Sequence, residues 1–523
     1  MGKTIRSGVF SMLSQRGATF LFPGLETFSE QSPLGLYLEG RLDACLRATA
    51  GAASVADQIL RVRALIRKTD YLTALDTIAG IESKDDNASA LLLALKSSCH
   101  SYRGELDLAR GALAAVRPNE HGLDVRFELA YAKVLIAWVE GDSDAMERAL
   151  YDFGDSPSAS VLARWYFARS WIAALRGEYV QQLVLLEQTV QHIVASPHSH
   201  DLFLLAKATR AMVHLVREID APETFAFAVR MVESLPWNDE LETERFLTFR
   251  GLAWAYALRG LHEKAFQYAY FARDIAPSAS WVTASYCDQA YLARMAGENR
   301  SADALVDHAV ACAKETDWTS RGEERVSLLN LVELVADRDP AAARAVLSIY
   351  EAIPVAVAPA LAFAHDVRLS AMEEYAAGVA LAASGERGAA VEDLASAYST
   401  FSSIGYAWRA AAAALRLHMV TGEDTWLRYA SDAVQDFTQS SVAEQIRRRA
   451  AATVVDPRVA ALTPAQRRVF ALLCEGLSDK EIAKSLGISP ETAKNHAARV
   501  RTAFGVHSRA ALIASTRGLA AVV

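Results

Sequence analysis

The chain of 523 residues contains little cysteine, proline or glycine: 5 Cys, 14 Pro and 27 Gly. Because Pro and Gly interrupt helices, their scarcity among abundant Ala and Leu favours helix. The sequence also lacks Val- and Ile-rich runs bounded by turns, which would indicate strands. The cysteines are odd in number, scattered and without CxxC spacing, so we expect free thiols rather than disulfides or a metal site. The predicted fold class is all-α.

Long apolar runs are absent as well. The longest, at 354–364, contains two prolines and is too short to span a bilayer. Near the N-terminus, Lys3, Arg6 and Arg16 interrupt any apolar run that could act as a signal peptide. We therefore expect a cytoplasmic protein without a membrane partner.

Complete catalytic and cofactor motifs are missing. The tripeptide at 2–4, Gly-Lys-Thr, looks like the end of a phosphate loop but has no upstream glycine and no preceding strand. HExxH and GxSxG do not occur. Three histidines, His192, His198 and His200, lie around a proline, where an exposed polar loop is a better interpretation than a metal site. The sequence predicts neither an enzyme nor a bound cofactor.

Charge is distributed unevenly. Residues 457–523 hold ten Lys or Arg and four Asp or Glu, so their balance is +6, whereas the whole chain carries −8 and the remainder therefore −14. A basic tail on an acidic body is expected when only the tail meets nucleic acid.

Residues 36–450 contain a weak internal repeat. A long helix ends in a small polar turn, and a shorter helix follows. Gly104 to Gly141 and Gly260 to Gly297 are each 37 residues apart, and other turns fall at similar intervals. The turn glycines are Gly104, Gly141, Gly177, Gly260, Gly297, Gly385 and Gly422.

Two helices in a period of about 36 to 40 residues resemble a degenerate tetratricopeptide repeat. Such hairpins cannot bury their apolar faces alone, so they are expected to stack into a superhelix with a concave surface. Aromatic residues on the long helices, such as Trp254 and Trp408, could line a binding wall or fill the space between hairpins, and we favour packing.

The last stretch, 462–523, has clear helix start and stop signals. Capping boxes are expected at Thr463–Gln466 and Ser478–Glu481, and a third helix begins at Ser489–Pro490. A turn of only three residues, 486–488, separates the second and third helices, which favours helix-turn-helix geometry. Glycine follows each helix, at Gly476, Gly487 and Gly505.

The third of these helices has one apolar stripe and one polar, cationic face. Successive residues turn by about 100°, which puts three further apolar residues within about 40° of Ala493. The stripe is Ala493, Ala497, Val500 and Phe504. Asn can bond an adenine edge, Lys and Arg can reach guanine, and Ala leaves room for close approach. The candidate base-reading residues are Lys494, Asn495, Ala498, Arg499 and Thr502.

The order of these residues resembles the LuxR/GerE-type helix-turn-helix family. The matching pieces are LTP at 462–464, EGLSDKEIAKSLGIS at 475–489, TAKNH at 492–496 and FGVHSR at 504–509. There are two departures from the family pattern. Residues 465–468 replace a usual Arg-Glu-x-Glu, and Ala493 stands where Val is usual.

The resemblance implies a four-helix DNA-binding head. It assigns phosphate contact or support of the recognition helix to Lys480, Ser489, Thr492, His496, Ser508 and Arg509. It also implies that the last helix pairs two heads, through Ala510, Ala511 and Ala514. The implied partners are two-fold promoter DNA, a second copy of the chain and RNA polymerase. Large regulators of this type often carry a nucleotide-hydrolysing domain, for which this chain has no motif.

The expected organisation is an irregular segment at 1–35, a repeat body at 36–450, a linker at 451–461 and the head at 462–523. Two functions remain open. One is a transcription regulator, an activator by family analogy, whose body senses an unidentified protein or small molecule without ATP. The other is an interaction scaffold with secondary DNA binding. The arginines at 447–449 either touch DNA or form a solvated helix end, which we favour.

Overall fold

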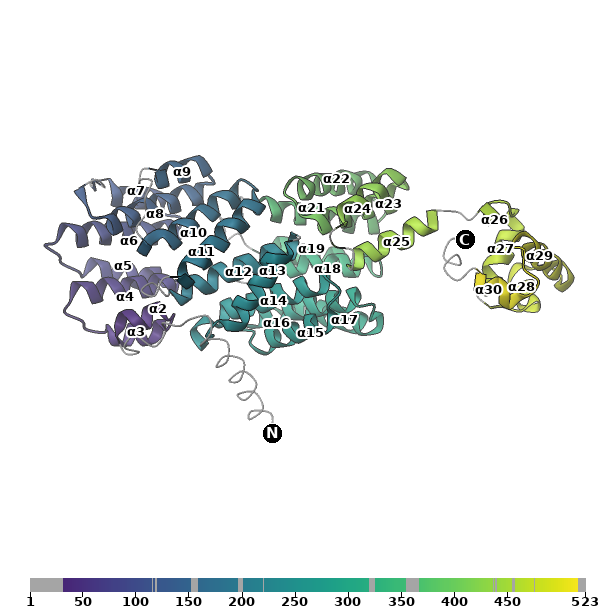
Figure 1. Ribbon diagram of the computed structural model, residues 1–523, viewed down its shortest axis with the longest axis horizontal. Helices are drawn as coiled ribbons and strands as arrows, with labels where there is room; N and C mark the ends of the chain where they lie inside the picture. Colours follow the sequence, from purple (N-terminus) through teal and green to yellow (C-terminus); the bar gives the residue numbers. More distant parts are fainter. Residues whose placement is uncertain are drawn as a thin grey trace, which may run out of the picture.

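The computed structural model describes most of the chain, and its described residues contain helices and no strand, as predicted. The described residues are 32–114, 116–117, 120–151, 159–195, 201–219, 221–318, 325–353, 366–435, 437, 440–453, 457–474 and 476–515. Figure 1 shows a long array of helices followed by a small C-terminal head. Residues 1–31, most of the predicted irregular segment, lie outside the described residues. The first described helix, α2 (Pro33–Leu38), begins inside that segment, with Ser32 as its N-cap.

The body is built from antiparallel helix pairs, which confirms the tetratricopeptide-like arrangement. After α2 and α3 (Leu42–Ala48), each pair packs one helix against the next one along the chain. The pairs are α4 (Val55–Arg67) with α5 (Tyr71–Ala79), α6 (Asp86–Tyr102) with α7 (Leu106–Leu113), α8 (Leu123–Glu140) with α9 (Ser143–Tyr151), α10 (Ala159–Leu175) with α11 (Tyr179–Ala195), α12 (Leu202–Glu218) with α13 (Pro222–Ser234), α14 (Glu242–Leu258) with α15 (His262–Asp274), α16 (Ala279–Met295) with α17 (Asn299–Glu315), α18 (Val326–Ala336) with α19 (Pro340–Ala352), α21 (Val367–Ala383) with α22 (Arg387–Ser403), and α23 (Ala407–Thr421) with α24 (Asp424–Ala433).

The repeated glycines are a requirement of the turns between paired helices. All seven predicted turn glycines have positive φ, between 71° and 85°. Residues with a side chain rarely adopt this left-handed conformation, because Cβ comes too close to the backbone. The repeat visible in the sequence is therefore the repeat of one helix-ending turn.

Aromatic side chains fill the space between hairpins. Trp254 and Trp408 are both buried, and their ring centroids lie 6.0 Å apart in a stacked arrangement. Trp138 and Trp171 stack in the same way, with centroids 5.4 Å apart. The packing interpretation of these rings is confirmed, and burial of such large side chains contributes strongly to stability.

Residues separated by about 190 positions also touch, so consecutive turns of the superhelix contact each other. Tyr179 Oη donates to Asp366 Oδ1 at 3.4 Å across 187 positions. Asn238 Nδ2 donates to the Glu39 carbonyl oxygen at 3.0 Å across 199 positions. These separations correspond to about five of the 37-residue periods.

A buried ion pair joins α12 to α23 across these turns. The Glu218 side chain is fully buried, and its Oε2 accepts hydrogen bonds from Trp408 Nε1 at 2.7 Å and Arg409 Nε at 3.0 Å. Arg217 Nη2 lies 2.7 Å from Glu218 Oε1. Burial alone would raise the pKa of Glu218, but the charges of Arg409 and Arg217 outweigh it and lower the pKa to about 2. We call this group the inter-turn ion pair.

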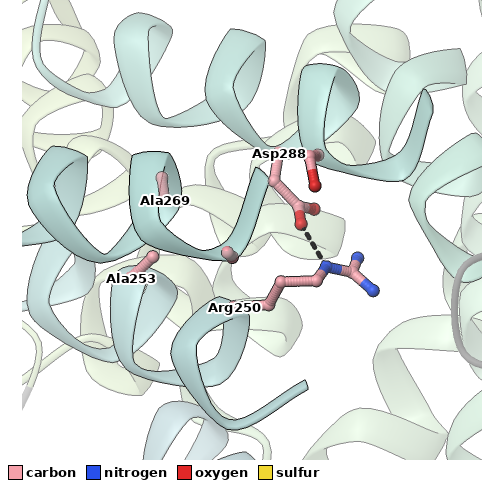
Figure 2. Close-up of a pocket in the computed structure, with 6 residues that line it drawn as sticks. Arg250, Ala253, Ala269 and Asp288 are labelled. Carbon is pink, nitrogen blue, oxygen red and sulfur yellow. Dashed lines mark hydrogen bonds and ion pairs between the residues drawn. The ribbon is translucent and has the colours of Figure 1, made fainter. Parts of the chain in front are cut away.

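A second buried polar group links α14 to α16 and α18. Arg250 Nε lies 2.5 Å from Asp288 Oδ2, and its guanidinium also donates to Ser327 Oγ. Figure 2 shows the Arg250–Asp288 pair beside a hollow that Ala253 and Ala269 help to line. The hollow has no room for a water-sized molecule. This group therefore holds helices together and is not a ligand pocket.

The predicted linker at 451–461 is largely helical. α25 (Ser441–Thr453) extends into it, and α26 (Pro457–Ala460) occupies its second half. Pro457 is suited to the first position of a helix, and the buried Val459 packs into the core of the head. The head therefore begins at α26, earlier than predicted.

The head contains α26 and four further helices, α27 (Pro464–Cys474), α28 (Asp479–Leu486), α29 (Pro490–Ala503) and α30 (Arg509–Ser515). Its core is separate from those of the body. At the centre, the rings of Phe470 and Phe504 stack with centroids 4.9 Å apart. Residues 516–523 lie outside the described residues.

All five cysteines are free, as expected. Within the described ranges, none of the helices combines the length and the apolar character needed to cross a membrane. The apolar run at 354–364 lies outside those ranges, as do His198 and His200. His192 stacks on Tyr166, with ring centroids 5.2 Å apart.

Candidate nucleic-acid interface

Local hydrogen bonds set the start of each helix of the head. Ser478 Oγ accepts from the Glu481 backbone N–H at 3.3 Å, and Glu481 Oε2 accepts from the Ser478 N–H at 2.6 Å. These bonds with Ser478 lower the pKa of Glu481 below its ordinary value. Thr463 and Gln466 form the same reciprocal pair, at 2.8 and 3.4 Å. Both predicted capping boxes are confirmed.

The turn between α28 and α29 has the predicted length and chemistry. Gly487 ends α28 with φ 63°, a left-handed conformation that favours glycine. Ser489 then caps α29, because its Oγ accepts from the Thr492 N–H at 3.1 Å, and Pro490 is the first helical residue. This short, capped connection fixes the direction in which α29 leaves α28.

One face of α29 is buried, as the helical wheel predicts. Ala493, Ala497, Val500 and Phe504 all lie in the core of the head. The opposite face is open: each of the five candidate base-reading residues is exposed. These are Lys494, Asn495, Ala498, Arg499 and Thr502.

The exposed face of α29 keeps its charges available. No carboxylate of the described residues forms an ion pair with Lys494 or Arg499. The hydroxyl of Thr502 donates to the Ala498 carbonyl at 3.1 Å, which leaves its oxygen free to accept a hydrogen bond. This face can therefore offer cationic donors from Lys494 and Arg499, an amide from Asn495 and a small apolar surface from Ala498, the set that suits base edges in a major groove.

The residues assigned to phosphate contact or support have mixed environments. Lys480 is exposed. Three of the hydroxyls take part in capping: Ser489 and Thr492 bond each other at 2.7 Å, and Ser508 Oγ accepts from the Ala511 N–H at 3.1 Å. These hydroxyls already hold helix N-termini, where backbone N–H groups favour a phosphate.

His496 and Arg509 are half-buried rather than open. Nδ1 of His496 is buried and finds no hydrogen-bond partner in the described part of the chain. Arg509 Nη1 lies 3.8 Å from Asp479 Oδ1, so this arginine connects α30 to the start of α28. Both positions fit support of the interface better than direct contact.

Among the described side chains of the proposed pairing helix, α30, Leu512 is buried. Ala510 and Ala511 are exposed. The side chain of Ala514 lies outside the described side chains. Pairing of two heads through these residues stays a prediction.

The contribution of α26 to the core of the head was not predicted from the sequence. The Arg458 guanidinium lies over the Phe504 ring, 4.7 Å from its centroid, and Val459 and Leu462 are buried in the same core. The three-residue spacing of Val459 and Leu462 after a proline is a helix signal that could have indicated this. By contrast, Arg447 and Arg448 pair with Glu444 at 2.9 and 2.8 Å, as expected for a solvated helix end.

Comparison with known proteins identifies the head. Residues 460–516 match the GerE family, described as bacterial regulatory proteins of the luxR family. Three relatives, one from Mycobacterium bovis and two from strains of Mycobacterium tuberculosis, carry the provisional name HTH-type transcriptional regulator. Each is 46% identical over 59 residues, 11% of this chain and 7% of the relative. The chain thus spans 7% of the length of the curated relatives that it matches.

Two solved structures resemble the chain loosely. A monomeric mutant of IFIT1 with Gppp-AAAA aligns with 84% of this chain and 99% of its own, at 13% identity and a TM-score of 0.39. The Cut9-Hcn1 hetero-tetramer of the APC/C aligns with 97% of this chain and 99% of its own, at 11% identity and a TM-score of 0.29. Scores this low support no argument about the fold, which rests on the helix pairs themselves.

The family match agrees with the geometry of the head. The capped helices, the short turn between α28 and α29 and the exposed polar face of α29 all fall within the matched residues. Residues 460–516 of this chain form a LuxR-type helix-turn-helix domain.

Proposed function

We propose that this protein is a sequence-specific DNA-binding transcription regulator that inserts α29 into the major groove of promoter DNA. The observation that carries the proposal is the division of α29 into a buried apolar stripe and an open face with Lys494 and Arg499 free of ion pairs among the described residues. The family match of the head supports it.

The distribution of charge favours the head as the part that approaches DNA. Residues 457–523 carry +6, and the rest of the chain carries −14. The phosphate backbone of DNA attracts the basic head and repels the acidic body. The body therefore opposes non-specific wrapping of DNA around the protein. Binding should weaken steeply as salt rises, because cations displaced from the DNA are released on binding.

Replacing Lys494 with Ala should weaken binding to the preferred duplex by about 1–3 kcal/mol and relax the base preference at the contacted position. The test is a gel-shift titration at fixed salt, with the full chain and a duplex that the unaltered protein has selected from a random pool. Lys84→Ala, which removes an exposed lysine of the body, is the matched control and should leave affinity unchanged. If Lys494→Ala keeps both the affinity and the base preference, Lys494 does not read bases.

The proposal extends to two copies on a two-fold site, held together through α30, and to activation of transcription through RNA polymerase. The exposed Ala510 and Ala511 support close approach of two such helices. Sedimentation of the protein on its selected duplex should give two chains per DNA. Deleting the gene should lower transcripts next to the sites mapped across the genome, and a rise would indicate repression instead.

A protein-interaction scaffold is the second candidate. Exposed apolar residues on the second helices of three pairs of the body, Leu72, Leu108 and Val180, favour it. Removal of residues 457–523 separates the two functions. A regulator would lose promoter occupancy, whereas a scaffold would keep the partners that its body captures.

A further inference from the structure

Five basic side chains gather between α4, α10 and α12. We call them the α4–α12 basic cluster, and they are Arg63, Arg67, Arg164, Lys207 and Arg210. Shared partners link four of these side chains in two pairs, and Arg210 lies three residues after Lys207 on α12. Glu128 accepts from Arg63 Nη2 at 2.6 Å and from Arg164 Nη1 at 2.7 Å. The Phe203 ring has the Arg67 guanidinium 4.8 Å and the Lys207 ammonium 4.6 Å from its centroid.

The cluster has more positive than negative charge. Its acidic partners in the described residues are three: Glu128, Asp201, which pairs with Arg67, and Glu244, whose Oε2 is 3.2 Å from Arg210 Nε. Five cations against three carboxylates leave an excess of two positive charges. Aromatic faces surround the cations, because the Arg67 guanidinium also lies 3.8 Å from the Tyr37 ring centroid.

Part of this charge forms no ion pair among the described residues. Lys207 has no described carboxylate within ion-pair distance. Burial lowers the pKa of Lys207 below its ordinary value, although the more distant Glu244 acts in the opposite direction. Nε of Arg63 is buried and has no hydrogen-bond partner among the described residues. Keeping such groups desolvated and unpaired is costly, and a bound anion would remove the cost.

Solvent reaches the cluster, so a small ligand can reach it too. The side chains of Arg63, Arg164 and Arg210 are 29%, 31% and 30% exposed. Lys207 and Arg210 lie on the same helix, α12, and the side chain of Arg210 is more exposed than that of Arg67.

We propose that the α4–α12 basic cluster binds a small phosphate-bearing anion. A phosphate group carries close to two negative charges near pH 7 and offers three strong acceptor oxygens, which matches the excess charge and the unpaired donors of Lys207 and Arg63. The assignment of this cluster as an effector site rests on the proposed regulatory function. Binding of the anion itself does not depend on DNA recognition.

The test is calorimetric titration of the full chain with inorganic pyrophosphate in a metal-free, phosphate-free buffer. We expect one site per chain, and Lys207→Met should weaken binding at least tenfold because it removes a charge-assisted contact. Lys264→Met is the matched control, since Lys264 also lies over an aromatic ring, Tyr256, but outside the cluster. It should bind pyrophosphate like the unaltered chain.

Three further measurements distinguish binding from a structural role. The melting temperature of Lys207→Met should be no lower than that of the unaltered chain, because the substitution removes an unpaired cation. Lys207→Arg should bind pyrophosphate as the unaltered chain does. Lys494→Ala, the DNA-recognition variant, should bind pyrophosphate normally, so failure of DNA recognition and failure of this site are separable. The proposal is overturned if pyrophosphate gives no binding, if Lys207→Met binds equally well, or if malonate binds as tightly as pyrophosphate.

Discussion

Replacing Glu218 with Gln is expected to lower the free energy of unfolding of the body by about 3–5 kcal/mol, the usual effect of removing one partner from a buried ion pair. Gln nearly conserves the volume of the side chain, so little cavity is formed. The loss comes from Arg409 and Arg217, whose charges would stay close together without the carboxylate that neutralises them. Both arginines have little exposure to solvent, which could otherwise screen them.

Tryptophan fluorescence during urea unfolding measures this effect directly. The Trp408 indole donates to Glu218 and lies beside Trp254, so it reports on the altered contact. Glu444→Gln is the matched control, because Glu444 also binds two arginines but is 45% exposed. Water screens that surface pair, and its loss should change the unfolding midpoint far less. Equal midpoints for the two variants would contradict a stabilising role for the inter-turn ion pair.

The same carboxylate gives the body a defined response to acid. The pKa of Glu218 is about 2 in the folded chain, below its ordinary value of 4.5. An unfolded chain therefore binds the proton first, so the contribution of Glu218 to stability is complete above about pH 4.5 and is lost as the pH falls toward about 2. Glu128 acts in the same direction, because Arg164 and Arg63 overcome its burial and lower its pKa to about 2. Glu218→Gln should make stability less dependent on pH across this range.

Replacing Phe470 with Ala should unfold the head and abolish DNA binding while the body stays folded. Phe470 is fully buried and stacks on Phe504, and truncation of such a ring typically costs about 3–5 kcal/mol. A domain of about 60 residues has only about 3–9 kcal/mol of stability in total. The substitution therefore removes most of the free energy that stabilises the folded head.

The positions of the tryptophans allow unfolding of the body to be measured separately from unfolding of the head. All nine tryptophans precede residue 457, so fluorescence follows the body alone. Phe470→Ala should leave the fluorescence melt unchanged and eliminate gel-shift complexes with any duplex. Phe470→Leu retains most of the buried apolar volume and should keep measurable binding. A shifted fluorescence melt in Phe470→Ala would mean that head and body unfold as one unit, which their separate cores argue against.

Features that depend on neighbouring residues were predictable from the sequence. The capping boxes, the glycine turns and the exposed face of α29 each follow from residues at most a few turns of helix apart. The period of the body is predictable for the same reason, since one turn type recurs at a regular interval.

Features that depend on distant residues could not be predicted. The inter-turn ion pair joins side chains 191 positions apart, and Arg67 meets Asp201 across 134 positions. No local pattern signals either pairing. The start of the head was placed late for a different reason: α26 is so short that the residues before Leu462 resemble a linker.

Contact between successive turns restricts how this protein can evolve in length. In an open array each hairpin touches only its neighbours, so duplication of one hairpin is tolerated. Here one added period of 37 residues would rotate all later helices by about a fifth of a superhelical turn, and Arg409 would no longer face Glu218. A duplication that preserves these pairings must add roughly 190 residues at once, the separation between Glu218 and Trp408.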